Sequence, residues 1–409
     1  MMIEKQFVGV DGRKIVHLKG REAAIDMGNS EVKAIFGTER SRMSIPNVIS
    51  EMDFSGLLEV EDDILDGIRV EVDSPALSHK WGSLAVGKLA GRQSTRIEVE
   101  PGSNKSEMDQ SLILLFTTLA IDAVKHFQVQ NNIVNATYFL STGLPIHEFK
   151  NKELRRDFKR KLKTGVHIVR FLETAAPYAN IEVRISIFDV KLNSEGKAAH
   201  MRLVMDEYGR PRNLPGVNGN YMIYDDGGGT ADVAIILAGG KPDNERSHGE
   251  RTLGINETLD RIMTDLRELY GGNIFESRKE LSDHLLQSRN INPLSTEYEK
   301  VYIKGKPTSI DDIVNKHLKV YASRVYEYMK GKWREVARLQ ACYFIGGAAS
   351  LIRPYLAELN NGEMDGEYNI HFLASNESFW ILSEAYYLSG KHYQARNKKQ
   401  KIVILPPLS

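Results

Sequence analysis

This chain of 409 residues has one cysteine, no net charge and no long apolar run. Each of these absences excludes some classes of protein. The single cysteine, Cys342, cannot form a disulfide within the chain, which favours a reducing compartment. No apolar run reaches the roughly 18 residues of a membrane-spanning helix, and residues 1–20 carry charges throughout. We therefore expect a cytoplasmic protein with neither a signal peptide nor a membrane-spanning segment.

Net charge is absent because 54 basic residues balance 54 acidic ones. A neutral chain has no general electrostatic attraction for nucleic acid, so we expect no direct contact with DNA or RNA. Neutrality also weakens the repulsion between copies of the chain, which permits self-association without demonstrating it. The length exceeds that of a usual single domain and predicts two or three domains with sizeable cores.

One stretch, residues 221–236, has the pattern of a β-hairpin whose tip is Asp225 to Thr230. Its tip contains Gly227, Gly228 and Gly229, and consecutive glycines weaken a strand unless another group must approach the backbone closely. Exposed N–H groups at such a turn form a concavity for phosphate oxygens, and a carboxylate beside it can hold the water shell of Mg²⁺. The alternative is an ordinary glycine-rich hairpin.

The same pattern occurs near the N-terminus, in residues 21–36, where Asp26 precedes a tight polar turn that contains Gly28 and Asn29. Lys33 follows the acid by seven positions. From the outgoing strand, its ammonium can reach back over the turn to phosphate oxygens. A second acidic hairpin makes a shared phosphate site the better interpretation.

A third glycine turn, residues 343–352, leads from an apolar strand into a helical pattern. The small residues Gly346, Gly347 and Ala348 at this junction allow a flat base or ribose to lie against the backbone. The following helix N-terminus favours negative charge.

Together the three turns resemble motifs of the superfamily of actin, the heat-shock chaperone ATPases and the sugar kinases. The two phosphate motifs and the adenosine motif correspond to Asp26-x-Gly28-x-x-x-x-Lys33, Asp225-x-Gly227-Gly228-x-Thr230-x-Asp232 and Ile345-Gly346-Gly347-Ala348-Ala349. Further segments resemble the bacterial actin-like proteins related to ParM, namely residues 84–90, 141–146 and 190–199. The resemblance covers roughly residues 23–390 and places this chain among the ParM-like actins.

The resemblance implies an α/β actin-like fold, in which two facing ribonuclease-H-like lobes with mixed sheets surround a nucleotide cleft. It predicts domain I at residues 1–194 and domain II at residues 195–374. Residues 375–409 then form a C-terminal helix that returns to domain I, followed by a tail.

The resemblance also implies roles for individual residues. Asp26 and Asp225 hold Mg²⁺ mostly through water, and Glu195, at the family's interdomain position, orients the attacking water. The alternative for Glu195 is a plain solvent-exposed side chain. Asp232 is expected to orient the second turn. ATP or ADP is bound by Gly28, Asn29, Lys33, Gly227, Gly228, Gly229 and Thr230 at the phosphates and by Gly254, Gly346, Gly347 and Ala348 near the ribose and base.

The implied function is an ATPase that polymerises with ATP and disassembles after hydrolysis, which segregates plasmid DNA through a DNA-binding adaptor at a centromere-like site. Alternatives on the same fold are a small-molecule (sugar-type) kinase, a cell-shape or phage actin, and a scaffold without hydrolysis. A chaperone ATPase is disfavoured because only about twenty residues follow the last predicted helix, too few for the substrate-binding domain of that family.

The rest of the chain gives coarser expectations. Residues 6–18 predict a hairpin around Asp11–Gly12, and the basic and apolar tail, residues 397–408, is expected to be docked or disordered rather than a membrane anchor. The strongly basic stretch 148–163 predicts a solvated helix face, with a polyanion site as the alternative. Other predicted helices are 106–129, 198–208, 255–270, 279–290, 310–328, 351–360 and 379–389.

Overall fold

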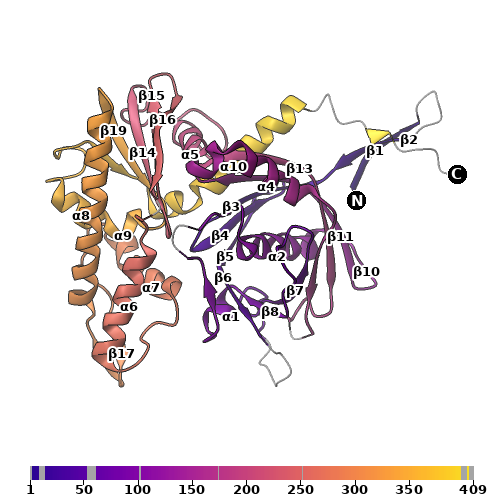
Figure 1. Cartoon of the computed structure of the whole chain (residues 1–409), viewed down its shortest axis with the longest axis horizontal. Helices are drawn as coiled ribbons and strands as arrows, with labels where there is room; N and C mark the ends of the chain where they lie inside the picture. Colours follow the sequence, from indigo (N-terminus) through magenta and orange to yellow (C-terminus); the bar gives the residue numbers. More distant parts are fainter. Residues whose placement is uncertain are drawn as a thin grey trace.

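The computed structural model describes residues 2–8, 14–52, 61–100, 103–173, 175–250, 252–397 and 403–404. Two lobes lie side by side, each built around its own sheet, with helices α5 and α10 lying between them (Figure 1). In the described part of the chain, no helix is long and apolar enough to cross a membrane.

The sheet of the first lobe has the strand order β5-β4-β3-β11-β13-β12-β7-β8-β6-β9, with β10 paired to β11 outside this path. At its centre, β11 runs parallel to both β3 and β13. The strands are β3 (Arg21–Met27), β4 (Glu31–Phe36), β5 (Ser41–Pro46), β6 (Val48–Glu51), β7 (Arg69–Asp73), β8 (Leu84–Val86), β9 (Ile97–Glu98), β10 (Val129–Gln130), β11 (Ile133–Leu144), β12 (His167–Phe171) and β13 (Glu182–Ser194).

Helix α2 (Asp109–His126) lies against this sheet and contacts strands from β3 to β13. The sequence pattern predicts one apolar face, but nearly all side chains from Asp109 to Ala123 are buried. The difference arises because the curled sheet surrounds the helix instead of covering one side of it. The lobe also contains α1 (Lys88–Gly91), α3 (Ile146–Lys150) and α4 (Lys152–Lys163).

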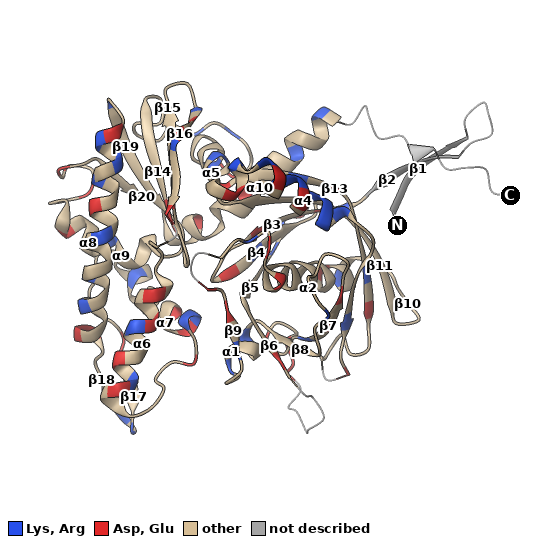
Figure 2. Ribbon diagram, in the orientation of Figure 1, with Lys and Arg blue, Asp and Glu red and all other residues tan. Residues whose placement is uncertain are grey.

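The basic stretch 148–163 is not one helix, because the chain breaks at Asn151. The Asn151 side chain accepts hydrogen bonds from the backbone N–H groups of Glu153 and Leu154 and thereby caps α4. Phe158 and Leu162 are buried, and Lys and Arg occupy most of the other positions along α4, which is largely blue in Figure 2.

The second lobe has the strand order β16-β15-β14-β19-β20, in which β14 pairs antiparallel with β15 and parallel with β19. Its strands are β14 (Asn220–Asp226), β15 (Ala231–Leu237), β16 (Lys241–Glu250), β19 (Leu339–Ile345) and β20 (Ile370–Phe372), beside a separate pair, β17 (Val301–Ile303) and β18 (Lys306–Thr308). The helices are α6 (Asn256–Tyr270), α7 (Arg278–Ile291), α8 (Asp311–Glu335) and α9 (Ala349–Leu359).

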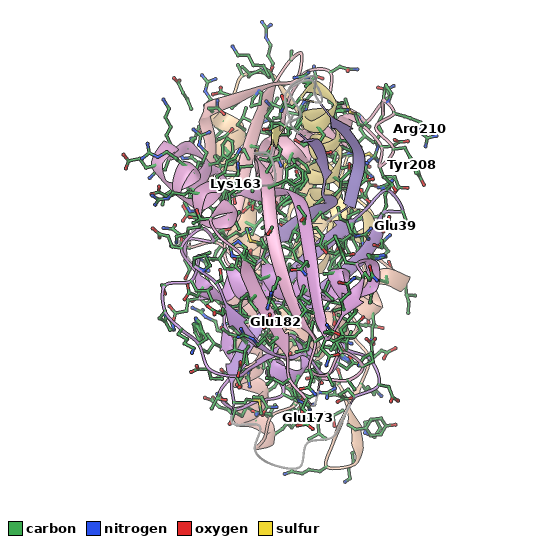
Figure 3. All side chains as sticks on the ribbon, turned by 90° about the vertical axis from the view of Figure 1, so that its right-hand side faces the viewer. Glu39, Lys163, Glu173, Glu182, Tyr208 and Arg210 are labelled. Atoms are coloured by element: carbon green, nitrogen blue, oxygen red, sulfur yellow. The ribbon has the colours of Figure 1, made fainter. Side chains whose placement is uncertain are left out.

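Helices α5 (Glu195–Val204) and α10 (Ser375–Asn397) join the lobes. The interdomain helix was expected at 198–208, but it begins directly after β13 and ends at Val204 because Met205 is extended and bridges to Pro211. The turn that follows carries Tyr208 and Arg210, whose side chains point outward (Figure 3).

Helix α10 extends well beyond the predicted 379–389 and returns to the first lobe, where it contacts β3, β4, β11 and β13. It contacts α5 through a buried ion pair in which Arg202 Nε lies 2.6 Å from Glu384 Oε2. The two connecting helices are therefore tied to each other as well as to the sheets.

At the ends of the chain, β1 (Met2–Val8) pairs antiparallel with β2 (Lys14–Lys19), and β2 pairs with β21 (Val403–Ile404). The strands of the predicted N-terminal hairpin are thus present. Its Asp11–Gly12 turn and all of the 397–408 tail except Asn397 and residues 403–404 lie outside the described residues.

A substitution at Gly143 tests how closely α10 docks on β11. An added Cβ there would overlap the hydroxyl of the buried Tyr386, so Gly143→Ala is expected to lower the free energy of unfolding by about 1–3 kcal/mol. The matched control is Gly331→Ala in α8, where an added Cβ meets no atom within 4 Å and helix propensity favours alanine. Denaturant unfolding of both variants is the measurement; equal stabilities would contradict close docking.

Candidate functional site: a cleft between the lobes

The first acidic hairpin consists of β3 and β4, with its tip at residues 28–30. Asp26 and Lys33 are direct cross-strand partners, and the Lys33 ammonium lies 3.0 Å from Asp26 Oδ2. The spacing of seven positions seen in the sequence is therefore a consequence of strand register. The Lys33 ammonium also lies 5.0 Å from the ring centre of Phe379 in α10.

The second hairpin, β14 and β15, places Asp225 directly opposite Asp232. The tip is closed by a hydrogen bond from the Gly227 N–H to the Thr230 carbonyl at 3.0 Å. The start of α6 holds it from behind, because the Asn256 N–H donates to the Gly228 carbonyl at 2.8 Å.

The third turn joins β19 to α9, and Gly346 adopts a φ of 92° there, in the region that favours glycine. Because β14 and β19 are parallel, their ends reach the same edge of the sheet. The Ala348 N–H donates to the Asp226 carbonyl at 3.1 Å, which fixes the third turn beside the second hairpin.

All three turns open onto one cleft, which encloses about 1040 Å³ of space including its mouth. The residues predicted from the sequence that line it are Asp26, Gly28, Asn29, Lys33, Glu195, Asp225, Gly227, Gly228, Thr230, Asp232, Gly346, Gly347 and Ala348. Glu195, only 4% exposed, stands at the start of α5 inside this cleft instead of in solvent.

Two of the predicted residues, Gly229 and Gly254, do not line the cleft. A Cβ on Gly254 would meet the backbone of Gly228 and Thr230, so this glycine lies directly behind the second tip. A Cβ on Gly229 would meet the side-chain amide of Asn29, so here the two hairpin tips touch. Both glycines support the tips by allowing close approach of backbone.

Several lining residues were missed by the sequence analysis, which had no pattern to find them. Ser30 and Glu31 belong to the first hairpin, Lys105 to a turn before α2, and Ser378 and Phe379 to α10, whereas the others come from the first turns of α7. The missed polar and aromatic residues are Ser30, Glu31, Lys105, Arg278, Lys279, Ser282, Asp283, Ser378 and Phe379.

Carboxylates outnumber ammonium groups in the inner cleft, where Asp26, Glu195, Asp225 and Asp232 face Lys33 and Lys105. Burial and the neighbouring charges of Glu195 and Asp26 raise the pKa of Asp225 to about 7. Burial also raises the pKa of Asp232 and of Glu195. The inner cleft is therefore electrostatically suited to an additional cation.

Lys33 of the inner cleft remains charged. Burial alone would lower the pKa of Lys33, but the carboxylates of Asp26, Glu31 and Asp225 outweigh it and raise the pKa. Within the described residues, no group of three or more His, Cys, Asp or Glu side chains is arranged to hold a metal ion directly.

Direct contacts across the mouth join the two lobes. Arg278 Nη1 of α7 lies 3.0 Å from Glu98 Oε2 of β9 in the first lobe. Lys279 Nζ lies 3.6 Å from Glu31 Oε2, at the start of β4. These two ion pairs link the lobes directly, in addition to the connecting helices.

The chain matches two family models in succession. Residues 24–196 match the N-terminal domain of actin-like proteins, and residues 220–377 match the Alp7A C-terminal domain. A search of curated protein sequences finds no match.

Solved structures of actin-like proteins share the fold. Bacillus thuringiensis ParM with ATP has a TM-score of 0.69 at 22% identity and covers 92% of this chain and 100% of its own. A 15-stranded ParM filament from Clostridium botulinum has a TM-score of 0.63 at 18% identity, covering 92% and 100%. Ta0583, an archaeal actin homologue, has a TM-score of 0.63 at 16% identity, covering 91% and 99%. The two successive family matches, over residues 24–196 and 220–377, place the chain among the actin-like proteins, and the ParM structures share its fold.

Proposed function

We propose that this chain binds ATP with Mg²⁺ in the interlobe cleft, hydrolyses it to ADP and phosphate, and couples the cycle to reversible filament assembly. The observation that carries the proposal is the convergence of two acidic hairpin tips, one from each lobe, on a single cleft. In this assignment residues 1–194 are domain I, residues 195–374 are domain II, and residues 375–409 are the returning helix and tail.

The triphosphate would lie between the two tips. Backbone N–H groups at Gly28 and in residues 228–230, together with the Asn29 amide, are the donors for its oxygens, and Lys33 supplies a fixed positive charge. The Gly227 N–H was expected to donate as well, but it is already bonded to the Thr230 carbonyl. The adenosine would lie over the third turn, where an added Cβ on Gly347 would meet no atom within 4 Å. This open backbone surface fits a flat base.

The donor set of the inner cleft fits Mg²⁺ held through water. Asp26 and Asp225 are hard oxygen donors on opposite lobes, and Mg²⁺ gives up its waters reluctantly. When bound, the ion neutralises the phosphate oxygens during phosphoryl transfer. The excess of carboxylates over ammonium groups is what this additional positive charge would balance.

Glu195 would orient the attacking water from the start of α5. The water oxygen forms a bond to the γ-phosphorus while the bond from that phosphorus to the bridging oxygen breaks, and ADP leaves with the electron pair. The proton of the water is accepted weakly by Glu195 and passes to the released phosphate. Asp232, opposite Asp225, would orient the second tip.

A nucleotide that contacts both tips links the lobes, so ATP favours closure and loss of the γ-phosphate permits opening. A change in lobe angle alters a head-to-tail contact between copies, and such contacts form filaments when they do not close into a ring. Related proteins support this proposal: Bacillus thuringiensis ParM has been solved with ATP, AMPPNP and ADP, and Clostridium botulinum ParM as a 15-stranded filament.

We extend the proposal to plasmid segregation through a DNA-binding adaptor at a centromere-like site. The zero net charge of the chain supports an adaptor because it provides no general attraction for DNA. Pull-down of the adaptor with filaments, compared with bare DNA, tests this extension.

Assembly is expected to depend on the nucleotide. With ATP and Mg²⁺, light scattering rises and then falls as ATP is consumed, whereas ADP or the absence of nucleotide gives no lasting signal. Chelation of Mg²⁺ is expected to abolish phosphate release. A protein that stays monomeric at high concentration with ATP and Mg²⁺ would eliminate the filament part of the proposal, and electron microscopy is the direct check.

Two substitutions test the assigned carboxylates. Asp225→Ala and Glu195→Ala are each expected to lower phosphate release by about 100-fold or more, since each removes a group that acts on the reacting phosphate or water. Glu195→Ala retains ATP binding, because the residue contacts the water rather than the phosphates. The control is the exposed Glu245→Ala in β16. Unchanged turnover in either variant removes that residue from the mechanism.

Glu98→Ala tests closure of the cleft. It removes the ion pair to Arg278 while the pair of Arg278 with Asp260 in the second lobe remains, and loss of about 1 kcal/mol of interlobe attraction speeds release of a fluorescent ADP roughly fivefold. Arg261→Ala, which breaks a 2.6 Å pair to Glu257 within α6, is the matched control and leaves the rate unchanged. Stopped-flow fluorescence measures both; equal rates would show that the ion pair does not restrain opening.

A further inference from the structure

A buried lysine that the proposed mechanism leaves without a role lies beside Glu195. Lys105 is 7% exposed, and its Nζ lies 2.8 Å from Glu195 Oε1. Lysine is rarely buried this deeply without a specific partner. It comes from the turn before α2, far in sequence from every motif of the cleft.

A second buried carboxylate fixes the turn that carries this lysine. Glu148 in α3 accepts hydrogen bonds from the backbone N–H groups of Lys105 and Ser106, each at 2.9 Å, and from the Ser106 hydroxyl at 2.6 Å. Three donors on one carboxylate leave the turn little freedom. The backbone of Lys105 is therefore rigidly placed.

The register of the sheet places Glu148 and Glu195 just beyond the same edge, at the ends of two neighbouring strands. α3 follows β11, α5 follows β13, and these neighbouring parallel strands end with Leu144 beside Ser194. Lys105 spans the two strand ends, with its backbone held by Glu148 and its ammonium on Glu195. The contact is thus part of the edge of the sheet and not a chance surface pair.

The charge on the lysine persists in this environment. Burial would lower the pKa of Lys105, but Glu195, Asp26 and Asp232 outweigh it and the pKa is raised. The ammonium occupies Oε1 of Glu195, which leaves Oε2 as the oxygen that can accept a hydrogen bond from water. A carboxylate held at one oxygen has a defined direction for the other.

We propose that Lys105 is the positioning residue of the hydrolytic carboxylate, holding Glu195 by Oε1 so that Oε2 orients the attacking water. The inference rests on the proposed ATPase function. It assigns Lys33 to the phosphates and Lys105 to the water-orienting group, so the two lysines of the inner cleft have separate tasks.

The test compares Lys105→Met with Lys105→Arg and with the exposed Lys152→Met on α4 as control. Lys105→Met is expected to lower single-turnover phosphate release at least 30-fold while the Kd for AMPPNP changes less than threefold. Lys105→Arg restores part of the rate because it keeps the charge, and Lys152→Met matches the unmodified protein. Filaments of Lys105→Met formed with ATP persist because hydrolysis no longer releases them.

A double variant separates positioning from direct phosphate contact and from structural damage. If Lys105 acts through Glu195, Lys105→Met slows hydrolysis less than threefold further when Glu195→Gln is already present. The double variant removes both charges, so it keeps a melting temperature near that of the unmodified protein even where Lys105→Met alone unfolds. The positioning role is overturned if the effects of the two substitutions on the hydrolysis rate multiply in full. It is also overturned if Lys105→Met weakens AMPPNP binding by as large a factor as it slows hydrolysis.

The outcomes distinguish this inference from the function on which it rests. If the unmodified protein hydrolyses ATP, Glu195→Gln does not, and a folded Lys105→Met does so at the normal rate, only the role of Lys105 fails. If the unmodified protein releases no phosphate from ATP, the proposed function fails and this role falls with it.

Discussion

Repulsion among the carboxylates of the inner cleft is the constraint on which the rest of the site depends. Asp225 and Asp232 face each other across a hairpin, Asp26 approaches from the first lobe, and Glu195 approaches from the start of the connecting helix α5. Two ammonium groups offset only part of this charge, and burial limits the help of solvent. The fold keeps the group together because each carboxylate stands at the end of a packed strand or helix, where it cannot move away.

Local patterns were enough to predict the parts of the site that lie within one hairpin or one turn. Asp26 and Lys33 are cross-strand neighbours, so their relation follows from strand period alone. The positive φ of Gly346 is likewise a local property of its turn. The convergence of the three turns was not local, and it was predicted through resemblance to actin-like proteins.

The remaining residues could not be predicted because distant pairings place them. Lys105 reaches Glu195 only because β11 and β13 end at the same level and Glu148 holds the intervening turn. Gly254 was expected near the ribose and base from the resemblance, whereas in the structure it allows close contact with the backbone of the second tip. Similarly, the helical period of α2 cannot show that a curled sheet buries its outer face.

Helix α10 links the third glycine turn mechanically to the sheet of the first lobe. Its first turn is attached to the third glycine turn, since the Ser378 hydroxyl donates to the Gly346 carbonyl at 3.1 Å, and its later turns lie on β3 and β11. Its 23 residues make a rod about 35 Å long that is stiff along its axis. If the proposed nucleotide site is correct, a tilt of α10 at the third glycine turn is carried along this rod to the strands of the first lobe on which its later turns lie.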